Sequence, residues 1–481
     1  MSNVLAVMPE IVVTVVATLV LLVDTMLPRR AERGWLALLT VAGLLVALVS
    51  GPFVAVPGTA FNGFVQIDTF TTFSRVVFIV LAIFAVLVAP GYLARHDIPA
   101  GEYYAIILFS TVGAMTIALS NDLITLFLGI ELMSIPVYAL AGMQRHDRYS
   151  NEAALKYFLL GAFSSSLLLY GFAWLYGVTG TTEFGPIAAA VARTGLADGP
   201  TLIALALVTA GLGFKAAVVP FHQWTPDAYD GAPTPATAFM SVAPKAAAFA
   251  AILRLMVGGL GPLGTDWGIA FAVLAAVTMT LGNVVALAQT NVKRMLAYSS
   301  VAHTGYILAA VAAYRAGDSA GAAVLFYVIA YGLMNLGAFA CLLYFDIEGT
   351  RGATLIELNG FARQEPLGAL TFAIFLISLT GIPPTVGFVA KVFVIQPVLD
   401  AGLTWLAVII ALNAVLAAFY YLRVVVHLYM HETDERSAPI ISERMLNVSL
   451  GVSALAVVVL GVLPDGLYAW ALQAAAPLVL R

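Results

Sequence analysis

Long apolar runs separated by short polar connections are the dominant pattern of this chain. A run of about 20 residues is long enough to cross about 30 Å of hydrocarbon as a helix. The pattern predicts fourteen such helices, at 9–27, 34–54, 71–92, 102–120, 122–142, 151–176, 200–220, 233–258, 267–288, 294–314, 319–345, 366–398, 404–430 and 445–463. A last apolar stretch, 466–480, is too short and too interrupted to span. We therefore expect an all-α polytopic membrane protein.

Two of the predicted helices are interrupted in a similar way. Glycines, prolines and a lysine occur in both: Gly211, Gly213, Lys215 and Pro220 in the seventh, and Gly381, Pro383, Pro384, Gly387 and Lys391 in the twelfth. Each is the fourth helix of a five-helix block, helices 4–8 and 9–13. Because five is odd, the second block enters the membrane from the opposite side. The pattern predicts two inverted repeats with helices 7 and 12 broken, an arrangement typical of transport sites around an internal polar cavity.

These interruptions and loops divide the chain into four parts. We expect an N-terminal three-helix segment at 1–98, a first five-helix repeat at 99–260, a second, inverted repeat at 261–432, and a C-terminal helix and tail at 433–481. The first apolar run, 11–23, ends at Asp24 and a Pro-Arg-Arg turn without a small-residue cleavage site. It is therefore interpreted as a retained span rather than a signal peptide.

Composition supports a membrane protein and argues against cofactors on this chain. Of its 481 residues 62% are hydrophobic and 10% are charged, whereas soluble proteins have about 25% charged residues. The single cysteine, Cys341, excludes an internal disulfide and an iron–sulfur cluster carried by this chain alone. Nucleotide-binding and haem-attachment motifs are absent. No spacing places His303 opposite His427 as a haem pair, and we expect no metal site.

The loops differ strongly in their basic residues. With alternate loops assigned to opposite sides, one side collects 12 of them: Arg29, Arg30, Arg33, Arg95, Arg145, Arg148, Lys293, Arg294, Arg351, Arg363, Arg436 and Arg444. The other side has 3: Arg193, Arg315 and Arg481. The positive-inside rule predicts that the first side is cytoplasmic and that both termini face outward. Arg75, Arg254 and Arg423 fall toward helix ends or within snorkelling reach.

Four of the five lysines lie within apolar segments: Lys156, Lys215, Lys245 and Lys391. A lysine in mid-membrane costs a few kcal/mol, so it usually faces a protein interior or water and marks an ion or proton path. Structural alternatives remain for each. Lys215 precedes one helix break and Lys391 follows the other. At a break an ammonium can bind carbonyls that have no partner in the helix. Lys156 lies five or six residues from the predicted edge at Ser150 and can snorkel.

Glu131, near the middle of the fifth helix, is the acidic candidate for this path. An opposite charge stabilises the ionised form of a lysine while desolvation opposes it, so a change in pairing can make the lysine take or release a proton. Lys215, beside the break, is the expected partner of Glu131. The alternative is a buried acid that is neutral, or paired only for packing.

Histidines and acids near the breaks are further candidates. His303, mid-span in the tenth helix, can relay protons because imidazole titrates near neutral pH, although a hydrogen-bonded core histidine is the alternative. His222, Asp227 and Asp230 fall in the connection after the seventh helix, where a structural or gating role is expected.

Five long motifs resemble a known family. They are residues 128–132 (Leu-Gly-Ile-Glu-Leu), 220–235 (Pro-Phe-His-Gln-Trp to Gly-Ala-Pro-Thr-Pro), the Pro-Lys pair at 244–245, residues 291–303, and residues 378–388 (Ser-Leu-Thr-Gly-Ile-Pro-Pro). In these the chain closely resembles subunit N of NADH-quinone oxidoreductase, an antiporter-like membrane subunit of respiratory complex I. The resemblance covers nearly the whole chain.

The resemblance implies fourteen helices in two inverted repeats and one proton path per subunit. Glu131 matches the family's fifth-helix glutamate, and Lys215 matches the lysine paired with it. Lys245 matches the connecting eighth-helix lysine, Lys391 the twelfth-helix lysine toward the exit, and Lys156 a sixth-helix lysine of the path. The family's flavin (FMN) and iron–sulfur clusters belong to partner subunits.

The function expected from the resemblance is outward proton translocation coupled to electron transfer from NADH to quinone in other subunits. The expected location is the inner membrane of a bacterial cell, beside other membrane-arm subunits that include neighbouring antiporter-like ones, with no nucleic acid. The main alternative is a subunit of a Mrp-type cation/proton antiporter. The presence of nucleotide- and cluster-binding partners distinguishes the oxidoreductase from this antiporter. Another alternative is a structural subunit with inert buried charges. Lysine replacements that leave pumping intact would favour it.

Overall fold

In a computed structural model of the protein, residues 3–28, 33–54, 57–196, 199–314, 317–345, 354–433, 441 and 443–478 are described, without the side chains of 52–54. This part of the chain is helical apart from a small antiparallel hairpin, β1 (Gly58–Ala60) with β2 (Val65–Ile67), and its connecting loops. Thirteen segments of it are long and apolar enough to cross a membrane. The expected all-α polytopic fold is confirmed.

The first eight predicted spans all coincide with helices. They are α2 (Met8–Met26), α3 (Gly34–Val54), α4 (Thr69–Leu87), α6 (Ala100–Leu119), α7 (Leu123–Ala141), α8 (Arg148–Thr179), α10 (Gly199–Ala216), and α12 (Thr234–Met240) followed by α13 (Ala243–Ile252) and a π-helical segment (Leu253–Gly259). Short helices α1 (Asn3–Ala6), α5 (Pro90–Arg95), α9 (Phe184–Thr194) and α11 (Trp224–Gly231) lie between them.

The remaining six predicted spans coincide with helices as well. They are α14 (Gly264–Leu287), α15 (Val292–Ala312), α16 (Asp318–Cys341), the pair α18 (Pro366–Thr380) and α19 (Val386–Asp400), α20 (Thr404–Met430) and α21 (Arg444–Val462). Helices α17 (Phe361–Gln364) and α22 (Asp465–Ala475) are short. At 15 residues each, α18 and α19 rise only about 22 Å, less than the hydrocarbon thickness. The count of fourteen spans and the repeat relationship therefore stay predictions.

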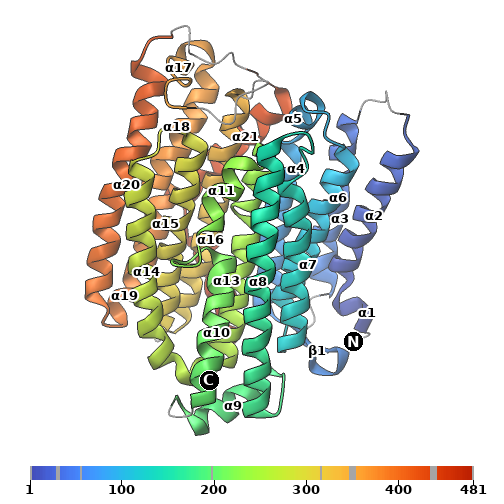
Figure 1. Cartoon of the computed structure of the whole chain (residues 1–481), viewed down its shortest axis with the longest axis vertical. Helices are drawn as coiled ribbons and strands as arrows, with labels where there is room; N and C mark the ends of the chain where they lie inside the picture. Colours follow the sequence, from blue (N-terminus) through green and yellow to red (C-terminus); the bar gives the residue numbers. More distant parts are fainter. Residues whose placement is uncertain are drawn as a thin grey trace.

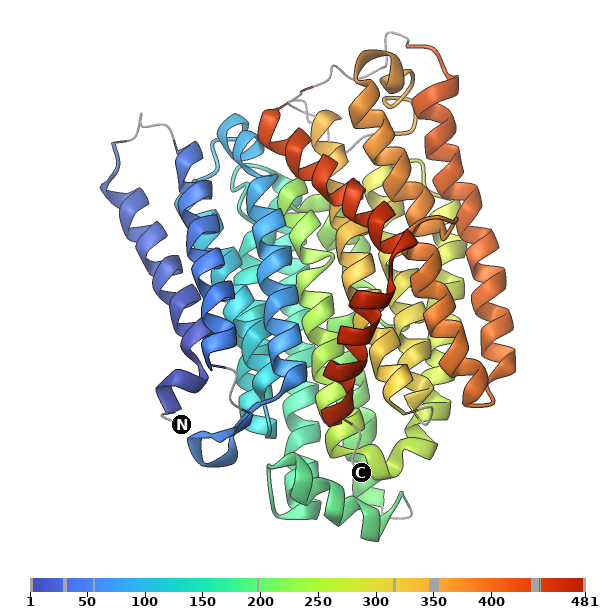
Figure 2. The same ribbon diagram turned by 180° about the vertical axis from the view of Figure 1, so that it is seen from behind.

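The long helices stand side by side along the longest axis of the molecule (Figure 1). Helices α2 and α3 form one edge of the bundle, and α19 and α20 lie at the other. Helix α21 runs obliquely across one face, where it packs on α16, α18 and α19 (Figure 2). Helices α1 and α9 lie at one end of the bundle and α5 and α17 at the other, and α22 descends toward the α1 end (Figures 1 and 2).

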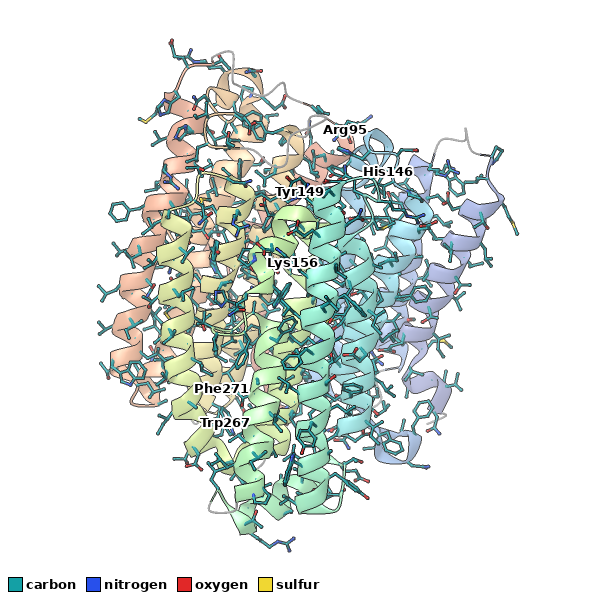
Figure 3. All side chains as sticks on the ribbon, in the orientation of Figure 1. Arg95, His146, Tyr149, Lys156, Trp267 and Phe271 are labelled. Carbon is teal, nitrogen blue, oxygen red and sulfur yellow. The ribbon has the colours of Figure 1, made fainter. Side chains whose placement is uncertain are left out.

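Only some of the loop arginines counted for the predicted sidedness lie in the described part of the chain. Arg95 and His146 lie at the end opposite Trp267 and Phe271 (Figure 3). The assigned residues Arg29, Arg30, Arg315, Arg351, Arg436 and Arg481 are outside the described residues. The assignment of Lys293 to a loop is wrong. Its ammonium is buried on α15 and donates to the carbonyl of Ala232 at 2.6 Å.

Both predicted breaks are present in the structure. Helix α10 ends at Ala216, and the next residue, Ala217, has a φ of +64°, a left-handed conformation that ends the helix. Pro220 lies in the connection that follows. Helix α18 ends at Thr380. The next residue, Gly381, has a φ of +89°, and Pro383 with Pro384 then delays the start of α19. Glycine tolerates this conformation and proline cannot continue a helix, so local sequence explains the second break. At the first break an alanine adopts the left-handed conformation, and Pro220 follows it.

A third interruption was not predicted. The segment 233–258 was expected to be one continuous helix, but Ser241 and Val242 form a turn between α12 and α13. Pro244 explains it, since proline has no N–H to donate to the carbonyl four residues earlier and its ring clashes with that carbonyl. Lys245 therefore lies in the first turn of α13 rather than deep inside a long helix.

Two arginines that were expected toward helix ends or within snorkelling reach are instead buried in ion pairs. Arg75 binds both carboxylate oxygens of Glu10 at 2.7 and 2.9 Å, and Arg254 binds those of Asp68 at 2.7 and 2.9 Å. The side chains of both arginines are only 5% exposed. The snorkelling expectation is wrong for them because acids on other segments reach them inside the bundle. Arg423 instead binds carbonyls at the end of α14.

Candidate functional site

The predicted pair of Glu131 and Lys215 is formed between α7 and α10. Lys215 lies in the last turn of α10, directly before the break, and Glu131 lies mid-helix on α7. The Nζ of Lys215 is 3.7 Å from Oε1 of Glu131. This separation is an ion pair but is too long for a direct hydrogen bond. The lysine side chain is 5% exposed and the glutamate 24%.

A hydroxyl group joins the two charges. Ser165 on α8 donates to Oε1 of Glu131 at 2.5 Å and accepts from Nζ of Lys215 at 3.0 Å. The ammonium also donates to Ser134 and to the phenol of Tyr138, both at 3.1 Å. We call Glu131 and Lys215, joined by the Ser165 hydroxyl, the bridged pair. With three donated hydrogen bonds the ammonium uses its full donor capacity.

Sequence reasoning missed the three hydroxyl groups around Lys215. A signal existed for two of them, because Ser134 and Tyr138 follow Glu131 by three and seven residues and so share its face of α7. Ser165 comes from a different helix, within a run of three serines. Nothing local to that run distinguishes the middle serine from its neighbours.

Aromatic side chains close the side of Lys215 that faces the break. The ring of Tyr138 packs edge-on against Tyr157 at 4.6 Å, and Tyr157 stacks on Trp224 of α11 at 4.2 Å. The indole N–H of Trp224 donates to the carbonyl of Phe214 at 3.0 Å. The Trp224 side chain therefore stabilises the break by donating a hydrogen bond to a carbonyl in the last turn of α10 that has no partner within the helix.

Lys245 lies deeper in the bundle and binds only neutral groups. Its Nζ is 2.5 Å from both the carbonyl and the hydroxyl of Ser300 on α15. The phenol of Tyr331 donates to the same hydroxyl at 2.7 Å, and its ring centroid lies 5.3 Å from the Nζ. Within the described part of the chain Lys245 forms no ion pair.

Lys391 is held at the second break. Its Nζ donates to the carbonyls of Leu379 at 3.1 Å and Thr380 at 2.6 Å. These are among the last carbonyls of α18, which have no partner within their helix and carry the negative end of its dipole. The ring of Tyr306 lies 5.0 Å from the Nζ. No carboxylate of the described residues forms an ion pair with this lysine either.

His303 lies between the aromatic rings that contact Lys245 and Lys391. Its ring is 5.1 Å from that of Tyr331, which contacts Lys245, and 5.6 Å from that of Tyr306, which contacts Lys391. The histidine is buried at 1% exposure. We call Lys215, Lys245, His303 and Lys391 the lysine line. The structure thus brings His303 close to the surroundings of Lys245 and Lys391, and Glu131 close to Lys215.

Lys156, the sixth predicted residue, lies apart from the lysine line. It is on the lateral surface of α8, below Tyr149 (Figure 3), and its side chain is 45% exposed. Its Nζ binds Glu152 at 2.8 Å and Asp227 at 3.0 Å. The adjacent residue Tyr157 points inward instead.

The acids after the first break belong to a helix rather than a loop. Asp227 and Asp230 are on α11, and both form ion pairs with Arg294, at 3.2 and 3.6 Å. The expectation of a loop is wrong because the connection folds back into helix at Trp224. His222 lies in the connection, and its Nδ1 is buried without a hydrogen-bond partner among the described residues.

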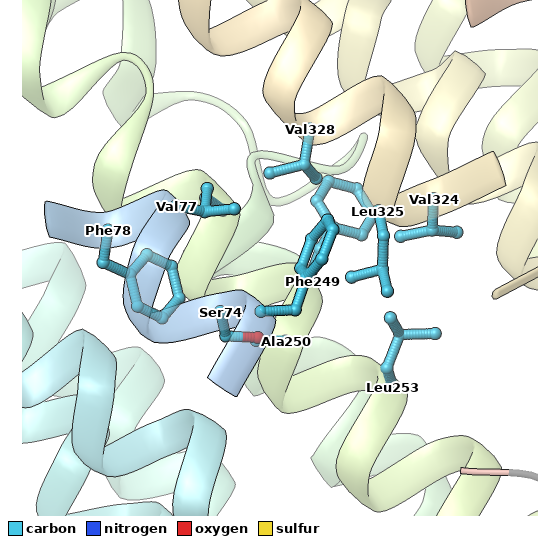
Figure 4. Close-up of a pocket in the computed structure, with 11 residues that line it drawn as sticks. Ser74, Val77, Phe78, Phe249, Ala250, Leu253, Val324, Leu325 and Val328 are labelled. Atoms are coloured by element: carbon cyan, nitrogen blue, oxygen red, sulfur yellow. The ribbon is translucent and has the colours of Figure 1, made fainter. Parts of the chain in front are cut away.

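No three His, Cys, Asp or Glu side chains gather at one place among the described residues. Figure 4 shows a small cavity of about 10 Å³ beside α13, lined by Ser74 of α4, Phe249 of α13 and Val324 of α16 among others. Ser74 is its single polar lining residue. A bound water needs two to four polar partners, so this cavity is a packing gap.

The arrangement can store and move charge. One carboxylate meets the first ammonium, and the following lysines meet only hydroxyls, carbonyls and aromatic rings. Such a series of buried titratable groups at helix breaks is typical of ion and proton pathways in membrane proteins.

Comparisons with known proteins point to one family. A family model described as NADH:quinone oxidoreductase/Mrp antiporter, TM matches residues 120–417, more than half of the chain and all of the lysine line. An NADH-quinone oxidoreductase subunit N from Trichlorobacter lovleyi is 43% identical over 478 residues, covering 98% of this chain and 97% of that protein. The chain belongs to the NADH-quinone oxidoreductase subunit N family. A subunit N 1 from Sorangium cellulosum is 44% identical over 488 residues, covering 96% of each chain.

Solved structures agree with membership of the subunit N family. A chain of respiratory complex I from Thermus thermophilus with bound aureothin superposes with a TM-score of 0.81 at 31% identity, covering 96% of this chain and 98% of that one. A chain of the Mrp complex from Dietzia sp. superposes with a TM-score of 0.79 at 24% identity, covering 98% and 97%. The second likeness is one of fold alone. The motifs that resemble subunit N therefore belong to a true member of that family.

Proposed function

We propose that this chain translocates protons outward across a bacterial inner membrane, as a membrane subunit of an NADH:quinone oxidoreductase. Electron transfer from NADH to quinone takes place on other subunits, which carry the flavin and the iron–sulfur clusters. The observation that carries the proposal is the bridged pair, Glu131 and Lys215 joined by Ser165, at the start of a line of buried lysines.

The bridged pair supplies a switch. At 3.7 Å, the attraction between the two charges is about 4–5 kcal/mol at an effective dielectric constant of about 20. When Glu131 moves away, the buried ammonium of Lys215 loses this stabilisation and releases its proton. When the pair forms again, Lys215 takes up another. Its position beside the α10 break gives the pair a segment whose backbone can move without breaking a continuous helix.

The rest of the lysine line gives the proton its next sites. Among the described residues Lys245 and Lys391 have only neutral partners, so a protonated ammonium there is held less firmly than in an ion pair. In the proposed order the proton passes from Lys215 to Lys245, then past His303 to Lys391, and leaves on the outer side. The carbonyls of α18 receive the charge at Lys391 and release it when the break shifts.

The surface charges support neighbouring membrane subunits as partners. Glu152, Lys156 and Asp227 form a charged cluster on the side of the bundle, where exposure to lipid is costly. We assign this cluster to contact with an adjacent antiporter-like subunit rather than to the internal route. The cytoplasmic side in this proposal is the end that carries Arg95, and both termini face outward.

The test replaces Lys215 with methionine, which keeps the length of the side chain and removes the charge. Proton uptake during NADH oxidation is measured in inverted membrane vesicles, with assembly of the complex checked on a native gel. Arg193→Met, at an exposed basic residue of α9, is the control for loss of one positive charge. We expect Lys215→Met to lower pumping by at least about tenfold. An assembled Lys215→Met complex that pumps like the control contradicts the proposal.

A further inference from the structure

Both ring nitrogens of His303 are bound by phenols. Its Nδ1 is 2.9 Å from the hydroxyl of Tyr327 on α16, and its Nε2 is 3.3 Å from the hydroxyl of Tyr421 on α20. All three side chains are fully buried. A neutral imidazole has one N–H donor and one acceptor nitrogen, so one phenol must donate to the ring while the other accepts from it.

The hydroxyl of Tyr421 has a second partner, Ser299 on α15. A hydroxyl has a single proton, so Tyr421 donates to one of its two partners and accepts from the other. Ser299, Tyr421, His303 and Tyr327 therefore form one chain of hydrogen bonds, which we call the phenol chain. It has two consistent arrangements. In one, every donor points toward Tyr327, and in the other every donor points toward Ser299.

The phenol chain lies between groups that contact two members of the lysine line. On the Lys245 side, Ser299 is the residue before Ser300, which binds Lys245. The ring of Tyr331 lies 5.3 Å from the Lys245 Nζ and 5.1 Å from the His303 ring. At the other end, the ring of Tyr327 lies 6.4 Å from that of Tyr306, which contacts Lys391. No direct hydrogen bond joins Lys245 to Lys391 in the described residues. The phenol chain spans the region between them.

We propose that Tyr327 and Tyr421 are positioning residues. They hold the His303 ring so that either neutral tautomer can form, and His303 then relays protons from Lys245 to Lys391. This inference rests on the proposed function. The two phenols determine which ring nitrogen carries the proton, because each tautomer fits one arrangement of the chain and is mismatched with the other.

The proton transfer balances along the chain. A proton from the Lys245 side binds the Ser299 oxygen, and the proton of Ser299 moves to Tyr421. The proton of Tyr421 moves to Nε2 of His303, and the Nδ1 proton moves to Tyr327. The proton of Tyr327 leaves toward the neutral amine of Lys391. One proton enters, one leaves, and every member of the chain ends neutral. The chain then stands in the second arrangement, with the imidazole proton on Nε2.

The experiment compares four variants of the complete complex. Tyr327→Phe and Tyr421→Phe each remove one hydroxyl and keep the ring. His303→Gln keeps a donor and an acceptor at one side chain but cannot pass a proton between them. Tyr103→Phe is the matched control, because the Tyr103 hydroxyl is buried without a hydrogen-bond partner among the described residues. Proton pumping is measured per assembled complex, and the melting temperature of each complex is recorded.

We expect each of Tyr327→Phe and Tyr421→Phe to lower pumping by about 2- to 13-fold relative to Tyr103→Phe, the range for loss of one neutral hydrogen bond. We expect His303→Gln to pump no faster than either phenylalanine variant. A purely structural histidine gives the opposite result, since glutamine keeps both bonds and pumping remains. Normal pumping by His303→Gln, or by both phenylalanine variants, overturns the inference.

Failure of the inference is distinguishable from failure of the proposed function. If Lys215→Met abolishes pumping while the phenylalanine variants pump like Tyr103→Phe, the lysine line stands and the phenol chain is structural. If Lys215→Met itself pumps normally, the proposed function fails. Should His303→Gln not assemble, the two phenylalanine variants, which leave the imidazole in place, decide the question.

Discussion

The hydroxyl of Ser165 provides the sharpest test of the bridged pair. The change Ser165→Ala removes one oxygen, which lies 3.0 Å from the Nζ of Lys215 and 2.5 Å from Oε1 of Glu131. The charges themselves stay 3.7 Å apart. Lys215 keeps its bonds to the hydroxyls of α7, so the substitution removes the bridge alone.

The size of the effect follows from these contacts. A hydrogen bond to a charged group contributes about 1.5–3 kcal/mol. One such bond changes the equilibrium between the joined and the separated pair by about 13- to 160-fold. The direct attraction of about 4–5 kcal/mol is retained, so the pair is weakened rather than lost. We therefore expect Ser165→Ala to lower proton pumping by about tenfold or more, because the joined state forms less often.

The assay is proton pumping by the assembled complex in inverted vesicles. Ser166→Ala is the matched control, since Ser166 is the next residue, is exposed, and donates only to the carbonyl of Ala162 in its own helix at 3.0 Å. Ser165→Thr keeps the hydroxyl and is expected to retain most of the activity. The reasoning about the bridge is refuted if Ser165→Ala pumps within twofold of Ser166→Ala.

Two further predictions concern the stability of the bundle and the second break. Arg254→Met leaves the carboxylate of Asp68 buried without its partner, and we expect a loss of about 3–5 kcal/mol in stability. Thermal unfolding of the complex measures it, and Arg363→Met, at an exposed ion pair, is expected to change stability by less than about 1 kcal/mol. Gly381→Ala forces a positive φ on alanine and places a methyl group 2.9–3.3 Å from the Lys391 side chain. We expect it to lower stability by about 1 kcal/mol or more and to slow pumping; unchanged pumping contradicts the role of this break.

The elements were largely predictable because each is determined by local chemistry. Run length alone determines which segments span, and proline with glycine placed the breaks in the segments of α10 and α18. The same rule applied to Pro244 predicts the break before α13, yet the apolar run around it suggested a continuous helix. The positions of Glu131 and the buried lysines were predictable as well, because charges are rare in such segments.

The polar partners of these charges were not predictable, because a hydroxyl in an apolar helix needs no distant partner. Thr40 and Thr111, for example, donate to carbonyls four residues earlier in their own helices. In sequence, Ser165 and Tyr327 cannot be told apart from such locally bonded hydroxyls, yet their side chains bind residues on other helices. Ion pairs such as Arg254 with Asp68 join segments 186 residues apart, a separation that no local pattern encodes.

The sequence by itself determined that the protein is a bundle of membrane-spanning helices with breaks beside buried lysines, since burial in lipid limits which residues and backbone conformations are possible. Only the tertiary structure decided which lysines share one interior. Lys156 and Lys215 both lie in apolar helices, but Lys156 faces outward and pairs with surface acids, while Lys215 turns inward and pairs with Glu131. The direction in which a helix presents a side chain depends on its packing against the other helices, and that packing is a property of the whole bundle.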